Sequence, residues 1–270
     1  MCVALYIGLS SSLFAEEKIK PEQLLEEHLK ALGSPEILQQ IKTRLIIGVA
    51  TMKYITGGSG QLAGKANWAS EKRKMGFVIQ FGARDYPGEH FAYDSKDVMV
   101  NYIQTNGQRS EIGNFLLNYD GIMKNGLLGG VLTVDWPLLN IQESKLEMKI
   151  KKKKVDDREL YEVEYLPNKS MEDVKVKMYF DPKTHYHVMT EYRLYRYSFI
   201  AYPSRLGENI ENHILIEKFE DFKSVDGVNL PHKYSLNYQL RGAMQVLYTF
   251  DAEKIVHNRP IDPQFYVAQK

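Results

Sequence analysis

Two histidines come closest to forming a chemical site in this chain. His185 and His187 are separated by one residue, so on a strand their imidazoles would share a face, a spacing that metal sites use. A metal-dependent hydrolase built on this pair needs at least one further ligand. His213, His232 and His257 qualify only because they stand at the ends of other predicted strands. Two exposed histidines beside a turn explain the same residues more simply, and we prefer that interpretation.

Other catalytic signatures are missing from the sequence. Cys2 is the only cysteine, and the chain has neither a Gly-x-Ser-x-Gly nucleophile turn nor a phosphate-binding loop. The glycine-rich run 57–60 precedes a predicted strand and not a helix, so it predicts a hairpin turn. We therefore predict a protein without catalysis, without a metal and without a cofactor.

The charge balance excludes a strong global field. The 270 residues carry 35 basic and 34 acidic side chains, a net charge of +1, which gives no support for a nucleic-acid partner. The one basic run, 151–154, consists of four lysines and is countered by Glu159, Glu162 and Glu164 on the following strand. We predict a solvated strand edge that resists aggregation, with a patch for a membrane or lipid headgroups as the alternative.

Strand-like alternation dominates the chain after residue 43. In 174–180, 232–240 and 244–250 every second side chain is apolar, as with Tyr234, Leu236 and Tyr238. Such alternation gives a sheet one dry face and one wet face, which is typical of antiparallel sheets and not of parallel ones. We predict about ten strands between residues 43 and 256.

Only a few short segments have helical spacing. Residues 21–33 and 34–41 are predicted helices, the second with Ser34 as its N-cap. Residues 109–126 carry an amphipathic stripe interrupted by glycines, and the apolar run 127–132 follows. The plain interpretation is a helix docked on the sheet. The sharper one is a mobile lid, because glycine-rich apolar segments open at low cost.

The numbers of strands and helices predict a curved sheet. About ten strands at ~4.8 Å spacing span roughly 48 Å when flat, whereas one helix covers a band about 10 Å wide. A few helices shield the dry face only if the sheet curls around them. The predicted fold is therefore mainly β (α+β): a strongly curved, antiparallel, unclosed half-barrel whose concave face is covered by the helices near 21–41 and 109–125.

Two hairpin phrases resemble a known family. Residues 180–184 (FDPKT) lead into a strand ending in 190–193 (TEYR), and 219–231 (FEDFKSVDGVNLP) lead into another. Both are similar to recurrent strand–turn–strand phrases of the periplasmic outer-membrane lipoprotein-sorting carrier superfamily. Turn formers alone would produce similar phrases. The resemblance implies an unclosed half-barrel that holds acyl chains between its sheet and its helices, and it assigns no individual residue a role.

The predicted function follows from this interior. We predict a periplasmic binding or carrier protein for lipid, lipoprotein acyl chains or another hydrophobic ligand, with an envelope membrane protein as a candidate delivery partner. The alternative is a non-transporting envelope protein, structural or interacting, with a packed interior. The apolar strand and helix stripes must face each other. We expect the ligand to be lined by Phe77, Ile79, Phe81, Ile112, Phe115, Leu116, Ile122 and Met123.

The first fifteen residues predict export. An apolar run, 2–9, leads through a serine-rich stretch to Ala15, as in the h-region and cleavage site of a signal peptide, although no basic residue precedes the run. We predict a signal peptide at 1–15, a single domain at 16–270 that starts near Glu16, and a periplasmic location. A buried N-terminal segment is the alternative. After cleavage the chain would contain no cysteine and hence no disulfide.

Overall fold

The computed structural model describes residues 19–267 except for 104–108, 140–147, 167–170, 172–173 and 200–207. The predicted signal peptide at 1–15 lies outside the described residues. Side chains of a few strand residues beside these gaps are likewise not described.

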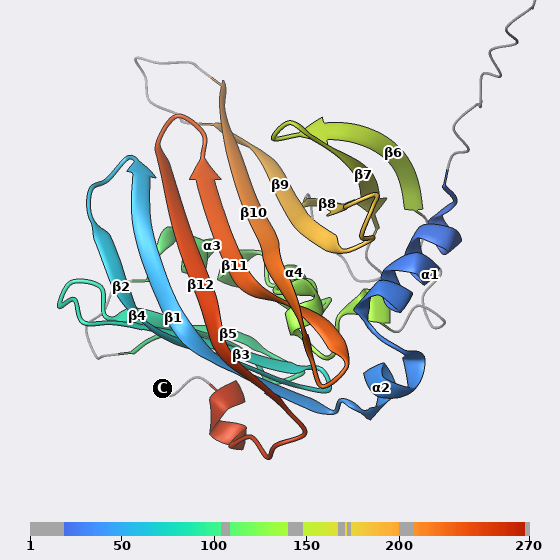
Figure 1. Ribbon diagram of the computed structural model, residues 1–270. Helices are drawn as coiled ribbons and strands as arrows, with labels where there is room; N and C mark the ends of the chain where they lie inside the picture. The colour runs from blue at the N-terminus through green and yellow to red at the C-terminus, as the bar shows by residue number, and fades with distance from the viewer. Residues whose placement is uncertain are drawn as a thin grey trace, which may run out of the picture.

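One antiparallel sheet of twelve strands forms the body of the molecule (Figure 1). Strands that follow one another in the chain pair, except β5 and β6, which are the two edges of the sheet, and β1 also pairs with β12. The predicted curved, unclosed antiparallel fold is confirmed, with twelve strands in place of about ten. The strands are β1 (Thr43–Thr56), β2 (Gln61–Glu71), β3 (Lys74–Phe81), β4 (Gly88–Tyr93), β5 (Val98–Tyr102), β6 (Met148–Val155), β7 (Arg158–Tyr165), β8 (Lys175–Phe180), β9 (His187–Phe199), β10 (Glu208–Val225), β11 (Val228–Leu240) and β12 (Met244–His257).

Two-residue turns fix the register of the longest hairpins. Asp226 and Gly227 have φ values of +50° and +81° and join β10 to β11, whose flanking residues Val225 and Val228 are paired. Asp156 and Asp157, at +47° and +61°, join β6 to β7 in the same way. Positive φ at both positions matches the twist of the strands, which is why Asp and Gly stand there.

Short helices occupy the ends and the concave side of the sheet. α1 (Pro21–Leu32) and α2 (Pro35–Gln40) precede the sheet, and the Ser34 hydroxyl caps α2 by accepting the Ile37 amide at 3.4 Å. Between β5 and β6 the chain forms α3 (Glu111–Asn118), α4 (Gly121–Lys124), η1 (Gly130–Leu132) and η2 (Pro137–Leu139). A last turn, η4 (Pro263–Tyr266), follows β12.

The connection between β5 and β6 fills the hollow of the sheet. We call residues 109–139 the inner segment. In Figure 1 its helices α3 and α4 lie behind β10, β11 and β12, on the concave side, whereas α1 stands at the side of the sheet next to β6. α1 contacts both β6 and β11, and its buried side chains include Leu24, His28 and Leu32. The predicted covering of the concave face by 109–125 is confirmed, and α1 closes one end of that space.

Candidate functional site: the interior of the half-barrel

The inner segment buries almost all of its apolar side chains against the sheet. Its buried apolar residues are between 0% and 3% exposed and belong to the same core cluster as the inward side chains of the strands. They are Ile112, Phe115, Leu116, Ile122, Met123, Leu127, Leu128, Val131, Leu132, Trp136 and Leu138. An apolar segment, and not a solvent-filled space, therefore occupies the described part of the interior.

The structure brings all eight predicted lining residues together in that cluster. Phe77, Ile79 and Phe81 come from β3, and the others come from α3 and α4. The Phe115 ring lies 5.6 Å from the Tyr238 ring of β11, so the helical stripe does face the sheet. Whether these residues bind a ligand stays a prediction.

An aromatic floor that the sequence did not single out supports the inner segment. Trp68 is fully buried and lies 4.8 Å from Phe77 and 5.7 Å from Tyr234, measured between ring centroids. Phe219 lies 5.4 Å from Tyr234 and extends the same layer. The sequence offered one indication of this layer: within their alternating strands, these aromatic residues fall at the positions whose side chains point inward.

Glu217 is a buried carboxylate that holds the inner segment to β10. Its oxygens accept hydrogen bonds from the Gly129 amide at 2.6 Å, the Tyr192 hydroxyl at 2.6 Å and the Tyr234 hydroxyl at 2.5 Å. Burial raises the pKa of Glu217 to about 7 despite these three donors, which favour the charged form. The carboxylate thus fixes a backbone position of the inner segment in an apolar surrounding.

Glu89 on β4 anchors the start of α3. One oxygen accepts the Ser110 amide at 2.7 Å, and the other accepts the hydroxyls of Ser110 and Tyr86. Ser110 in turn caps α3 by accepting the Gly113 amide at 3.0 Å. Burial raises the pKa of Glu89, and its hydrogen bonds and the nearby Arg109 oppose that rise.

Two further polar contacts tie the end of the inner segment to β1 and β2. The buried Arg44 guanidinium donates to the Val131 carbonyl and, at 3.0 Å, to Nε2 of His257. Burial lowers the pKa of Arg44 to about 9. The Ser70 hydroxyl accepts the Val134 amide at 3.1 Å. Glu89, Glu217, Arg44 and Ser70 together are the polar anchors of the inner segment.

Glycines allow the inner segment to approach the aromatic floor. Gly129 has a φ of +81°, and a Cβ there would overlap the Trp68 ring. Gly130 has a φ of +49°, and a Cβ there would stand 2.9 Å from Phe219 and 3.2 Å from His187. These glycines were expected to let a lid open. The structure shows that they also permit close packing at backbone angles that other residues rarely adopt.

The histidine pair does not form the exposed site that its spacing suggested. His187 is fully buried and His185 is half-buried, so the prediction of two exposed histidines is wrong. Its Nε2 lies 2.9 Å from the Thr190 hydroxyl, and its ring packs 4.9 Å from Trp136. His185 precedes β9 in a turn with φ +56°, where its carbonyl meets Nδ1 of the buried His28 at 2.7 Å.

The other three candidate histidines have hydrogen-bond partners of their own. His213, His232 and His257 bond respectively to the Tyr238 hydroxyl, the Leu230 carbonyl and Asp226. Within the described part of the chain, no group of three or more His, Cys, Asp or Glu side chains could hold a metal ion. Burial lowers the pKa of His187 well below its usual range, and this ring serves as a packed core side chain.

A cavity of about 540 Å³ lies on the outer side of the sheet, at the ends of β9 to β12. None of the eight predicted lining residues borders it. It is lined by Thr56, Arg193, Asn212, Ile214, Gln239, Leu240, Arg241, Gly242, Ala243, Met244 and Gln245. Among the described residues, no helix is both long and apolar enough to cross a membrane.

Comparison with known proteins gives a likeness of fold. No protein-family model and no curated protein matches the chain. A LolA-superfamily protein from Nitrosomonas europaea is similar at a TM-score of 0.47 and 10% identity, over 93% of this chain and 99% of that chain. A domain named for outer-membrane lipoprotein sorting, from Vibrio parahaemolyticus, is similar at 0.47 and 10%, over 90% and 94%. Both carry the name of the superfamily that the hairpin phrases resemble, and neither likeness assigns a residue a role or a ligand.

Proposed function

We propose that the protein is a non-catalytic binding or carrier protein for an elongated apolar ligand such as an acyl chain. The ligand enters the concave side of the sheet where the inner segment now lies. The observation that carries the proposal is the inner segment itself: an apolar, largely irregular stretch inserted into an open sheet and fixed by a few polar anchors.

The sheet and the inner segment are held by different interactions. Backbone ladders join all twelve strands without using the inner segment, and the β1–β12 pairing alone spans Arg44 to Thr56. The inner segment is held by apolar packing and by the polar anchors. A ligand that replaces its apolar contacts therefore has to break those few hydrogen bonds, while the sheet stays intact.

The free energy gained by burying an acyl chain is large enough to offset the loss of the polar anchors. Burial of an acyl chain is worth about 0.8 kcal/mol per methylene, so a dozen methylenes contribute about 10 kcal/mol. Each polar anchor contributes about 1 kcal/mol, and an anchor involving a charged group about 2 kcal/mol. The gain offsets the loss if the ligand takes over most of the apolar surface that the inner segment leaves.

The second candidate is an envelope protein with a permanently packed interior. It is favoured by the 0–3% exposure of the inner segment's core side chains. The two candidates differ in whether the inner segment exchanges with a ligand. A variant that weakens one polar anchor without altering the apolar lining separates them.

Ser70→Ala is that variant. It leaves the Val134 amide without its side-chain acceptor and should weaken the inner segment's attachment by about 1–2 kcal/mol. If opening precedes binding, a fluorescent fatty-acid probe should bind the variant about 5- to 30-fold more tightly than wild type. Tyr179→Phe is the matched control, because it removes a buried hydrogen bond to Glu162 on the outer face.

The outcomes are distinct. Tighter binding by Ser70→Ala, with Tyr179→Phe unchanged, supports a carrier whose inner segment yields to the ligand. Failure of the folded wild-type protein and of both variants to bind the probe at micromolar concentrations would refute the carrier proposal. The packed envelope protein would then be the better description.

Location and delivery belong to the same proposal. A carrier of acyl chains works in the periplasm if the apolar run 2–9 and Ala15 act as an export signal. Delivery to an envelope membrane protein would follow. Mass measurement of the chain purified from its own cell envelope tests the first step, since processing should leave Glu16 at the N-terminus.

A further inference from the structure

Basic side chains gather on the outer face of β6 to β9. Strand residues directly opposite each other share a face, and the pairs Lys149–Glu164, Glu164–Lys177 and Lys175–Arg193 run across these strands. Contacts of Glu162 place two more lysines of β6 on the same side. We call this surface, short of the β6–β7 turn and the adjoining Arg158, the lysine face; its basic members are Lys149, Lys151, Lys153, Lys175, Lys177 and Arg193.

The acidic side chains of this face are mostly buried beneath the lysines. Glu162 is 2% exposed, and its oxygens lie 3.0 Å from Lys151, 3.3 Å from Lys153 and 3.3 Å from Lys177. One carboxylate thus serves three ammonium groups. The predicted countering of the lysines by glutamates on the next strand is confirmed in position, but the balance of charge is unequal.

Glu191 is also withdrawn from solvent. It is buried and takes both its hydrogen bonds from the fork of Arg193, at 2.6 and 2.8 Å. Glu164 is the exposed carboxylate of the face. Six basic against three acidic side chains give the lysine face a net charge of +3, and solvent meets mainly the cations.

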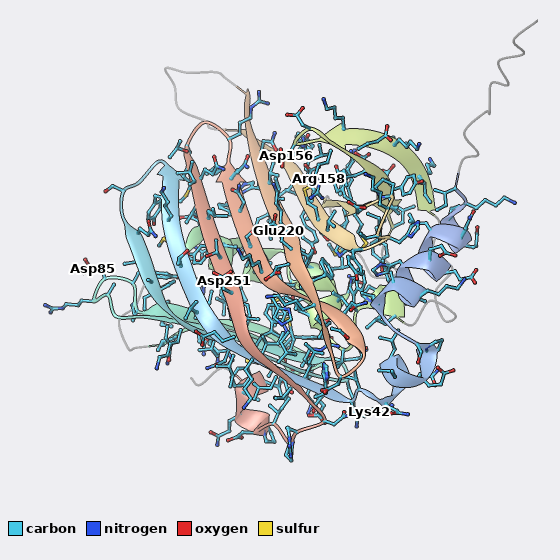
Figure 2. All side chains as sticks on the ribbon, viewed as in Figure 1. Lys42, Asp85, Asp156, Arg158, Glu220 and Asp251 are labelled. Atoms are coloured by element: carbon cyan, nitrogen blue, oxygen red, sulfur yellow. The ribbon has the colours of Figure 1, made fainter. Side chains whose placement is uncertain are left out.

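The unbalanced positive charge is densest on this part of the outer surface. Further along the sheet, Glu220 on β10 and Asp251 on β12 point outward, and Figure 2 shows both in front of the strands. The chain as a whole carries a net charge of only +1. Lys233 of β11 lies opposite both Glu220 and Asp251, so charges of the two signs alternate there, whereas cations predominate on the side of edge strand β6.

The chemistry of the face fits a diffuse anionic surface. Five of its six cations are lysines, which are hydrated point charges, and the guanidinium of Arg193 is engaged by Glu191. Three apolar side chains on the same side, Leu160, Tyr179 and Met189, are buried in a small cluster of their own. Tyr195, an exposed aromatic side chain on this side, accepts a hydrogen bond from Arg193 at 3.4 Å, and tyrosine is a residue that membrane interfaces favour. Five lysines around a single exposed ring suit lipid phosphates better than a protein hot spot or a stacked nucleic acid.

We propose that the lysine face docks the protein on an anionic lipid bilayer, with edge strand β6 against the headgroups. This interaction goes beyond ligand binding in the interior. It holds equally for a carrier and for an envelope protein with a packed core, because it uses none of the interior residues.

Vesicle co-sedimentation tests the docking. Wild-type protein should bind phosphatidylcholine vesicles containing about one-third phosphatidylglycerol and should not bind pure phosphatidylcholine. The triple variant Lys149→Gln, Lys153→Gln, Lys175→Gln should lose affinity on the order of a hundredfold. The control triple variant Lys53→Gln, Lys65→Gln, Lys254→Gln changes net charge equally on exposed lysines of β1, β2 and β12, and should bind as wild type does.

Several results would overturn the proposal. Equal losses in the two triple variants would mean that total charge, and not the lysine face, drives binding. The proposal would also be overturned if wild-type protein did not bind the vesicles, or if binding did not weaken when salt is raised from about 0.1 to about 1 M. A single-stranded oligonucleotide that displaces the vesicles and binds more tightly would assign the face to nucleic acid instead. Interior probe binding should be the same in both triple variants, so failure here is distinct from failure of the carrier proposal.

Discussion

Replacing Glu217 with glutamine should remove a large pH dependence of stability. Burial raises the pKa of this carboxyl from 4.5 to about 7, so the folded protein favours its protonated form. Between these two values the folded state binds more protons than the unfolded state. The stabilising contribution is therefore complete below about pH 4 and is lost as the pH rises through about 7.

The magnitude follows from the size of the shift. A difference of about 2.5 pKa units corresponds to about 3 kcal/mol in the free energy of unfolding. Glutamine has no proton to lose, and its side-chain oxygen still accepts the Gly129 amide. Its NH₂ group replaces one acceptor for the tyrosine hydroxyls, so we expect the variant to be about 1–2 kcal/mol less stable than wild type at the acid end, where Glu217 is protonated.

Urea unfolding of wild type and Glu217→Gln, at several pH values between about 4 and 8, provides the assay. The free energy of unfolding of wild type minus that of the variant should fall by about 3 kcal/mol from the acid to the alkaline end, so the variant becomes the more stable protein at about pH 8. Other titrating groups cancel in this difference. Parallel profiles for the two proteins would refute the reasoning, because they would show that Glu217 titrates alike in the folded and unfolded chains.

Two further perturbations test the packing of the interior. His28 is fully buried with its pKa lowered to about 4, so its own contribution to the free energy of unfolding should fall by about 3 kcal/mol as the pH falls from about 6.5 to 4, opposite in sign to that of Glu217. The free energy of unfolding of wild type minus that of His28→Phe should fall by this amount toward acid pH, and a difference that does not change with pH would contradict the assignment. Gly129→Ala combines a φ of +81° with overlap of the Trp68 ring and should cost at least about 3 kcal/mol. Gly60→Ala, at φ +110° with open space around it, should cost less, and equal losses in thermal melts would argue against the packing role of Gly129.

Local sequence patterns were sufficient to predict most of the fold. Period-two alternation located strands: the alternating run 244–250, for example, lies within β12 (Met244–His257). The turn at Asp226 and Gly227 was legible because few residues accept positive φ at two successive positions. The curvature followed from a mismatch between a wide dry face and few helices.

The polar anchors were not predictable from local patterns. Glu217 meets the amide of Gly129 across 88 positions in the chain, and Arg44 meets the carbonyl of Val131 across 87. The alternation of side chains along β10 places Glu217 on the inward side, among apolar residues. It does not reveal which hydrogen-bond donors offset the cost of burying this carboxylate. The spacing of His185 and His187 likewise gave no sign that His187 is covered by Trp136 and Phe219.

Mass spectrometry of an organic extract tests the binding of an apolar ligand most directly. The protein would be purified without detergent from its own cells, and the extract would be compared with that from an equal amount of a soluble protein of similar size. We predict a long-chain acyl lipid near one equivalent per chain, lost from protein that has been unfolded and refolded in lipid-free buffer. An extract containing no lipid above the control level, from protein that melts cooperatively, would contradict the claim that this half-barrel binds an apolar ligand in the cell.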